Sequence, residues 1–265
     1  MMETKLSGIS QSLLLPLYAR AEETQRTDAL FKDFTAIKIL EDLEIAPSKY
    51  KKSNFSTLGC IARTKILDDK VKEYIAKNPE ARIINLGCGL DDRYRRVDNG
   101  RIHWYNIDFP EVISLRDKYI QNDERVINLA QSVLDYIWLD KISYNHSDNI
   151  LIIAEGLLMY LEEKEVKELF INIASKFNNL TLYLELMSSW MVQNQKFHDI
   201  TDSDKIIFKW GVDKVKDFED ICPNYQLSES INLTYFMKKR SIFLKLFSKK
   251  MEKINNHIAI FNKKF

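Results

Sequence analysis

The stretch RIINLGCGLDDRYRR, residues 82–96, decides the fold of this chain. It begins as an apolar run, turns at Gly87 and Gly89, and then becomes densely charged. A buried strand followed by such a turn is typical of an open α/β sheet, in which ligands bind beyond the carboxyl ends of the strands. Glycine has no Cβ, so a ligand could approach the backbone closely here, although a plain tight turn explains the two glycines equally well.

The segments around this stretch alternate between strand-like and helical patterns. Continuous apolar strands that alternate with helices predict a mostly parallel sheet covered by helices on both faces. We expect strands at 82–86, 103–108, 125–130, 149–155 and 180–186, helices at 58–77, 110–120 and 162–177, and an antiparallel pair of 230–236 with 257–265 at the sheet edge.

The N-terminal region reads as helical over residues 10–45, with Leu30, Phe34, Ile37 and Leu40 on one side. The sequence contains no repeats or Gly/Ser-rich linkers. We therefore expect one domain over residues 1–265, in which 1–57 form a helical cap over the site and 58–265 form the ligand-binding core.

Composition limits the classes of function. Apolar residues make up 45% of the 265 residues, and 39 basic residues against 38 acidic ones give a net charge of +1, which provides no indication of nucleic-acid binding. Three cysteines without metal-ligand spacing predict a reduced, cytoplasmic protein with no metal site. The N-terminus does not read as a signal peptide, and the longest apolar run is broken by Glu155, so we expect no membrane span.

Acidic residues follow three of the expected strands: Asp91, Asp108 and Glu155. Asp108 lies 21 positions after Gly87, where a carboxylate can accept both hydroxyls of a ribose, or alternatively cap the helix opened by Pro110. Glu155 either faces the ligand cleft or turns outward, and its position favours the cleft. Asp135 is a fourth candidate, in the loop after 125–130.

The carboxylates of Asp91 and Asp92 would repel a diphosphate, and Asp92 stands where a dinucleotide-binding turn needs a small residue. The turn therefore suits a ligand that carries positive charge or hydroxyls. Arg63 shares the buried stripe of its helix with Leu67 and Val71, so it needs an anionic partner. That partner is either a ligand carboxylate or, through an internal salt bridge, Asp91 or Glu155.

Further candidates are less specific. By default His198 is a solvated loop residue, and Tyr160 and Trp210 are core or surface aromatics. Residues 238–253 contain seven basic residues and one acidic residue, which favours a solvated basic helix packed on the sheet over a membrane-surface or nucleic-acid role.

Seven blocks, in order along the chain, resemble the leucine carboxyl methyltransferase superfamily and its branch of bacterial O-methyltransferases of the tetracenomycin polyketide type. These blocks are LYARAEETQRTDALFKD, ARTKILDDKV, INLGCGLDDRYRR, WYNIDFPEVISLR, SVLDYIWLD, IIAEGLLMYL and HDITDSDKIIFKWG. The resemblance covers nearly the whole chain and implies a class I methyltransferase fold, a Rossmann-like seven-stranded sheet whose last hairpin is antiparallel.

The resemblance also implies S-adenosyl-L-methionine as the cofactor. By the family pattern, Arg63 would bind the methionine carboxylate, Gly87 and Gly89 would approach the cofactor, and Asp108 would bind the ribose. Asp135 would lie near the adenine, and Glu155 near the methionine amino group.

We therefore expect an enzyme that methylates a carboxylate or hydroxyl of a small, polyketide-like molecule, acting as a monomer or homodimer. His198 is the candidate base or substrate contact, and Arg20, Tyr160 and Trp210 are candidate substrate contacts. One alternative is a protein C-terminal carboxyl methyltransferase, for which Arg20 or Lys209 could supply a basic pocket. The other is a non-catalytic module that binds the cofactor without turnover.

Overall fold

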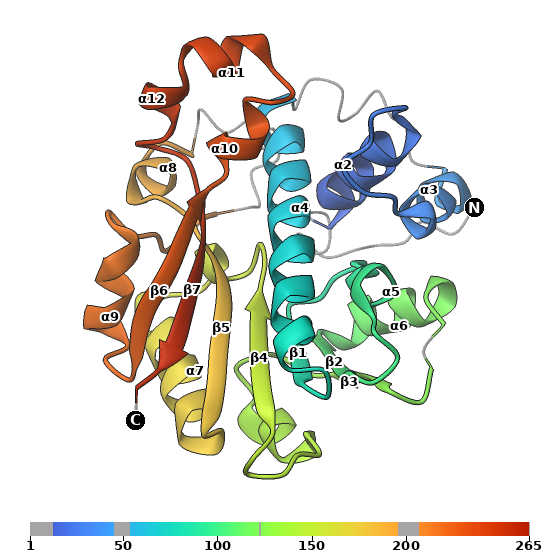
Figure 1. Ribbon diagram of the computed structural model, residues 1–265, viewed down its shortest axis with the longest axis vertical. Coiled ribbons are helices and arrows are strands. Elements are labelled where there is room, and N and C mark those ends of the chain that lie inside the picture. The colour runs from blue at the N-terminus through green and yellow to red at the C-terminus, as the bar shows by residue number, and fades with distance from the viewer. Residues whose placement is uncertain (1–12, 45–53, 122, 196–206, 265) are drawn as a thin grey trace.

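The computed structural model describes residues 13–44, 54–121, 123–195 and 207–264. Within them, one seven-stranded sheet has the order β3-β2-β1-β4-β5-β7-β6 (Figure 1). Strands β1 to β5 are parallel, and β7 lies antiparallel between β5 and β6. This arrangement confirms the mostly parallel sheet with an antiparallel last hairpin. The strands are β1 (Arg82–Leu86), β2 (His103–Asp108), β3 (Val126–Ala130), β4 (Asn149–Ala154), β5 (Asn179–Leu186), β6 (Tyr225–Asn232) and β7 (His257–Lys263).

Helices cover both faces of the sheet, as the apolar strands require. On one face, α4 (Asn54–Lys77) packs Leu67 and Val71 against Ile83 and Ile153 in one continuous core. On the other, α7 (Glu163–Lys176) packs its apolar stripe against β1, β4 and β5. Shorter elements complete the layers: α5 (Arg93–Val97), α6 (Pro110–Tyr119), η2 (Tyr136–Lys141), η3 (Leu158–Tyr160), α8 (Ser189–Gln193), η5 (Val215–Asp217) and α9 (Phe218–Ile221).

The N-terminal region contains two helices where the sequence predicted a single helical stretch. They are α2 (Leu14–Gln25), which lies beside α4 in Figure 1, and α3 (Phe34–Asp42), which lies beyond α2. The chain breaks between them because Asp33 caps α3: its carboxylate accepts the Ala36 N–H at 2.9 Å, while its own N–H donates to Thr24 Oγ1 at 2.7 Å. Phe34 was expected on the buried side of a longer helix but is 71% exposed, so that prediction is wrong.

The C-terminal antiparallel pair is confirmed, but its first strand begins earlier than expected. β6 ends at Asn232, and residues 234–237 form the helix α10 (Thr234–Met237). The basic stretch after it forms two short helices, α11 (Ile242–Leu246) and α12 (Ser248–Met251), where one helix packed on the sheet was expected. They lie outside the sheet layers in Figure 1.

Two further observations concern the described residues. None of the helices in the described ranges is both long enough and apolar enough to cross a membrane. Cys60, Cys88 and Cys222 are all buried and free.

Candidate active site

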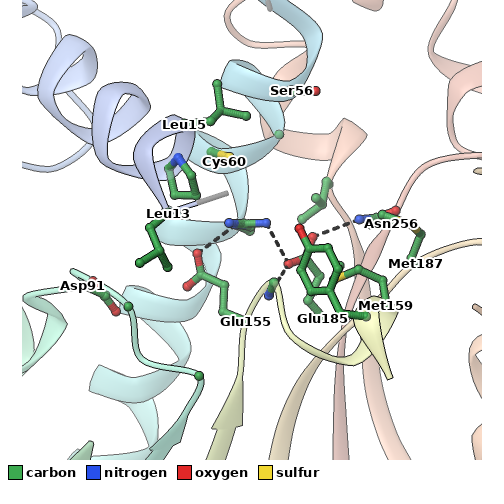
Figure 2. Close-up of a pocket in the computed structure, with 18 of the residues that line it drawn as sticks. Leu13, Leu15, Ser56, Cys60, Asp91, Glu155, Met159, Glu185, Met187 and Asn256 are labelled. Carbon is green, nitrogen blue, oxygen red and sulfur yellow. Dashed lines mark hydrogen bonds and ion pairs between the residues drawn. The ribbon is translucent and has the colours of Figure 1, made fainter. Parts of the chain in front are cut away.

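A cavity opens at the carboxyl edge of the parallel strands, between the sheet, α2 and α4 (Figure 2). It contains about 1220 Å³ of empty space, part of which is open to solvent. Its wall comes from eight separate stretches of the chain, including the loops after β1, β4 and β5. Of the residues singled out in the sequence, those that line it are Arg20, Arg63, Gly87, Gly89, Asp91, Glu155 and Tyr160.

The turn after β1 requires both of its glycines. Gly87 has φ +62° and Gly89 has φ +52°, in the left-handed region that disfavours side chains. A Cβ would lie 3.0 Å from Leu157 Cδ1 at Gly87, and 2.9 Å from Leu13 Cδ2 at Gly89. The turn therefore combines a positive-φ backbone with close packing, and it exposes main chain to the cavity.

Arg63 lies at the centre of an ion-pair cluster in the cavity wall. Its Nε donates to Glu155 at 2.8 Å, and its Nη1 donates to Glu185 at 3.0 Å. Glu185 also accepts the Gly156 N–H at 2.8 Å and the Asn256 side-chain amide at 2.9 Å. The internal salt bridge considered for Arg63 is thus present toward Glu155, together with a second bridge to Glu185 (Figure 2).

A second arginine, Arg93, also binds Glu155, although it does not line the cavity. Arg93, which is 1% exposed, donates to Asp68, Asp91 and Glu155 at 2.6–2.7 Å. Burial alone would raise the pKa of Asp91, but Arg93 and Arg96 hold it below its usual value. Asp91 therefore stays ionised at the cavity edge, and the guanidinium groups of Arg93 and Arg96 fix the orientation of its carboxylate.

The other acidic candidates are Asp108 at the end of β2 and Asp135 in the loop after β3, and neither lines the cavity. Asp108 is 8% exposed and accepts the backbone N–H groups of Gly89 and Phe109, each at 2.8 Å. Burial raises its pKa, and the two N–H groups partly offset that increase. Asp135 is exposed and accepts from Ile137 N and Gln131 Nε2. Asp108 thus supports the glycine turn, and its role toward a ribose stays a prediction, as does that of Asp135 toward adenine.

The opposite part of the wall is apolar. Met159, Met187, Met191 and Phe208 form a buried cluster that faces the cavity. Tyr160 packs against Phe208 with ring centroids 5.6 Å apart. Methionine is flexible and polarisable, so this part of the wall can adapt to differently shaped apolar groups.

The remaining candidates are placed differently. Arg20 lines the cavity but is held by Asp33 at 2.8 Å and by the Leu90 carbonyl at 2.9 Å. Trp210 is 5% exposed and belongs to the core beneath β4 and β5, so the structure does not bring it to the cavity wall. Lys209 extends its amine to Glu162 at 3.3 Å. His198 lies outside the described residues, and its role stays a prediction.

Two cysteines, Cys60 and Cys88, line the cavity. Burial raises the pKa of the Cys60 thiol, which lines the cavity, to about 11, so it is protonated at neutral pH. Across the described ranges, no three His, Cys, Asp or Glu side chains are arranged to hold a metal ion.

The sequence interpretation missed Glu185 and Arg93. Glu185 interrupts the apolar strand LTLYLEL in the same way that Glu155 follows LIIA, and that shared signal could have identified it. Arg93 follows the two aspartates directly, but sequence alone does not indicate which carboxylates it binds. Both residues are 1% exposed, which is unusual for charged side chains unless they are paired.

Comparison with known proteins agrees with this geometry. Residues 14–174 match the profile of the family described as Leucine carboxyl methyltransferase. The chain therefore belongs to the leucine carboxyl methyltransferase family, and it is a methyltransferase. The tetracenomycin polyketide synthesis O-methyltransferase TcmP of Streptomyces glaucescens is 25% identical over 226 residues, covering 85% of this chain and 83% of TcmP. The S-adenosyl-L-methionine-dependent methyltransferase dpfgK of Gibberella zeae is 25% identical over 247 residues, covering 84% and 82%.

Solved structures share the fold. A protein from Thermobifida fusca superposes with a TM-score of 0.62 at 17% identity and covers 93% of this chain and 94% of its own. The N-methyltransferase NodS of Bradyrhizobium japonicum, in complex with S-adenosyl-L-homocysteine, has a TM-score of 0.54 at 11% identity, covering 88% and 100%. At such identities these likenesses establish the methyltransferase fold alone.

Proposed function

We propose that this methyltransferase takes its methyl group from S-adenosyl-L-methionine and transfers it to a carboxylate or hydroxyl oxygen of a small, largely apolar molecule. The observation that carries the proposal is the two-sided cavity. One side presents Arg63, Asp91, Glu155 and the glycine turn, and the other presents methionine and aromatic side chains. The names of TcmP and dpfgK, two relatives of similar length, support the same reaction class.

The charges of the cavity wall fit this cofactor. Two arginines (Arg20, Arg63) and three carboxylates (Asp91, Glu155, Glu185) line it, so these side chains sum to −1. S-adenosyl-L-methionine carries an ammonium, a carboxylate and a sulfonium, which sum to +1. Opposite charge in a partly buried wall favours binding, because screening by water is reduced there.

Individual residues can then be assigned. Among described partners Arg63 uses Nε and Nη1, which leaves Nη2 to donate to the cofactor carboxylate. Glu155 would accept from the cofactor ammonium, and its two carboxylate oxygens already accept from Arg63 and Arg93. Gly156 has φ +62°, and a Cβ there would lie 3.2 Å from Nη2, so the glycine keeps that amino group accessible.

When bound, the cofactor supplies an activated methyl group on a sulfonium, and the protein's main task is to position the acceptor in line with it. Positioning of this kind can lower a barrier by about 7–11 kcal/mol. A carboxylate acceptor is already ionised at neutral pH, whereas a hydroxyl must lose a proton. For a hydroxyl acceptor we propose His198 as the base, because a histidine has a pKa near neutrality.

The apolar side of the cavity favours a small apolar acceptor over a peptide carboxylate. Arg20 and Lys209 could supply a basic pocket for a C-terminal carboxylate, but both already bind protein acceptors. Met159, Met187 and Met191 offer no hydrogen-bond donor side chain to a peptide. The protein-methylating alternative therefore has less support than the small-molecule one.

The test is a methyl-transfer screen with cofactor labelled on its methyl group. The acceptor sets are small aromatic carboxylic acids, phenols, and peptides with a free C-terminus, each assayed with and without a chelator. Transfer to the first or second set supports the proposal, and transfer to peptides alone overturns it. Calorimetric binding of S-adenosyl-L-homocysteine without transfer to any set would favour the non-catalytic alternative.

His198→Ala separates the two small-molecule acceptors. With a hydroxyl acceptor, general-base assistance is worth roughly 10²–10⁴-fold, so turnover should fall by that factor and the rate should no longer rise through the histidine pKa. With a carboxylate acceptor, the substitution should alter mainly acceptor binding. Wild-type rates at every pH would contradict any role for His198.

A further inference from the structure

The segment 234–254, which we call the β6–β7 insert, joins β6 to β7 through α10, α11 and α12. In Figure 1 it forms the outermost part of the molecule, beyond the end of the sheet at which β7 begins. Its inner side is anchored, because Met237 and Leu244 are 1% and 3% exposed and belong to the core around α4. Leu233 and Asn255, which flank it, both line the cavity.

The insert exposes several large apolar side chains to solvent. Ile242 is 82% exposed and Leu246 is 77% exposed. The two lie four positions apart on α11 and therefore on the same side of the helix. Tyr235 and Phe247 add further apolar surface, at 51% and 49% exposure. Single exposed apolar residues are ordinary, but several gathered on one short insert indicate a contact surface.

The same insert also carries exposed lysines. Lys245, Lys249, Lys250 and Lys253 are exposed, and none forms an ion pair with a residue in the described ranges. Arg240, by contrast, is bound to Glu23 and Asp28 on α2 and the loop after it. The whole chain carries only +1, so the four lysines represent a local concentration of positive charge.

We propose that the β6–β7 insert docks on the surface of an anionic phospholipid bilayer. Ile242 and Leu246 would enter the headgroup and acyl boundary, and the four lysines would contact the anionic headgroups. Charge complementarity favours this occupant. A second copy of the chain would bring the same lysines against each other, and a nucleic acid would leave Ile242 and Leu246 without an apolar partner.

The experiment measures sedimentation of the full chain with vesicles of phosphatidylcholine alone and of phosphatidylcholine mixed with phosphatidylserine. We expect binding to the mixed vesicles only, and weaker binding as ionic strength rises, because salt screens the lysines. No binding to the mixed vesicles at low ionic strength overturns the proposal.

Two variants test the two components of the surface. Lys249→Gln combined with Lys250→Gln should lower the vesicle partition coefficient roughly 30-fold, since each lysine near an anionic surface contributes about fivefold. Ile242→Ser should lower it roughly tenfold by removing an inserted side chain. The matched controls are Lys164→Gln with Lys167→Gln, two exposed lysines on α7, and Ile137→Ser, which removes an isoleucine that is 61% exposed.

Binding of S-adenosyl-L-homocysteine, measured for every variant, verifies the fold independently of vesicles. Equal loss in the insert variants and in their controls overturns the proposal, because the effect would then follow net charge or general apolarity. A dimer in solution that Ile242→Ser converts to a monomer, with no vesicle binding by either form, also overturns it and assigns the surface to self-association.

Discussion

The two sides of the cavity are built on different physical principles. The ionic side is held by ion pairs of 2.6–3.0 Å among Arg63, Arg93, Glu155 and Glu185. These ion pairs fix the orientation of each side chain before a ligand binds. On the apolar side, the methionine side chains around Met159 carry no charge and pack against one another and against Phe208. A cofactor that is always the same suits a preorganised wall, whereas an acceptor of variable shape suits an adaptable one.

The largest effect is expected for Arg63→Met, which removes the central cation of the ionic side. Removing the guanidinium leaves Glu155 and Glu185 with less compensation, and breaking a buried ion pair costs about 3–5 kcal/mol. Urea unfolding should register that loss, and calorimetry with S-adenosyl-L-homocysteine should show affinity about a hundredfold lower, since a charged hydrogen bond is also lost.

Two further variants distinguish the loss of stability from the loss of cofactor affinity. Lys65→Met, on the same helix, should change stability by less than about 1 kcal/mol because its ion pair with Asp69 is partly exposed. Adding Glu185→Gln to Arg63→Met should recover part of the stability and none of the affinity. Unchanged affinity in Arg63→Met would remove the arginine from the cofactor site.

The ionic side should also be the pH-sensitive side. The pKa of Asp91 is lowered in the folded protein, so its stabilising contribution is complete above its unfolded pKa of about 4 and is lost as pH falls toward the lowered value. Asp91→Asn should cost about 2 kcal/mol at neutral pH, on the order of one charge-assisted hydrogen bond. It should also flatten the decline of unfolding free energy between about pH 4 and pH 2. If the free energy of unfolding declined as steeply in the variant as in the wild type, other carboxylates would account for the decline.

Asp108→Ala tests the connection between the glycine turn and the cofactor. The substitution removes the acceptor of the Gly89 N–H and the proposed acceptor of the ribose hydroxyls. We expect at least about a tenfold loss of affinity for S-adenosyl-L-homocysteine, because charge-assisted hydrogen bonds contribute about 1.5–3 kcal/mol each. Asp92→Ala is the matched control, since Asp92 binds Thr35 and does not line the cavity. Equal losses in both variants would mean that the turn, and not the ribose, accounts for the effect.

The smallest effect is expected on the apolar side. Met159→Leu conserves volume and should cost less than about 1.5 kcal/mol of stability. It should change the KM for an acceptor and leave the Kd for S-adenosyl-L-homocysteine unchanged. Met237→Leu, in the core around α4, is the control that should change neither constant. If Met159→Leu changed the Kd for S-adenosyl-L-homocysteine, the cofactor site would include the apolar side of the cavity.

Local patterns were sufficient for most of the fold. The apolar run at 82–86 and the glycine turn predicted β1 and the sheet edge at which the cavity lies, because burial on both faces demands continuous apolar strands. The N-terminal helices were harder to predict. Their apolar spacing continues through residues 26–33, and the break depends on the Asp33 cap and on its bond to Thr24, which sequence periodicity does not register.

The sequence by itself determined which groups would meet at one edge: Arg63, Gly87, Asp91 and Glu155 follow or face the carboxyl ends of parallel strands, and those ends lie together in any such sheet. Only the tertiary structure decided their partners. Glu185 accepts from Arg63 across 122 positions of chain, and Arg93 reaches Glu155 across 62. Such pairings depend on side-chain direction and distance in the folded protein, because a buried charge binds the counter-charge that packing places within reach.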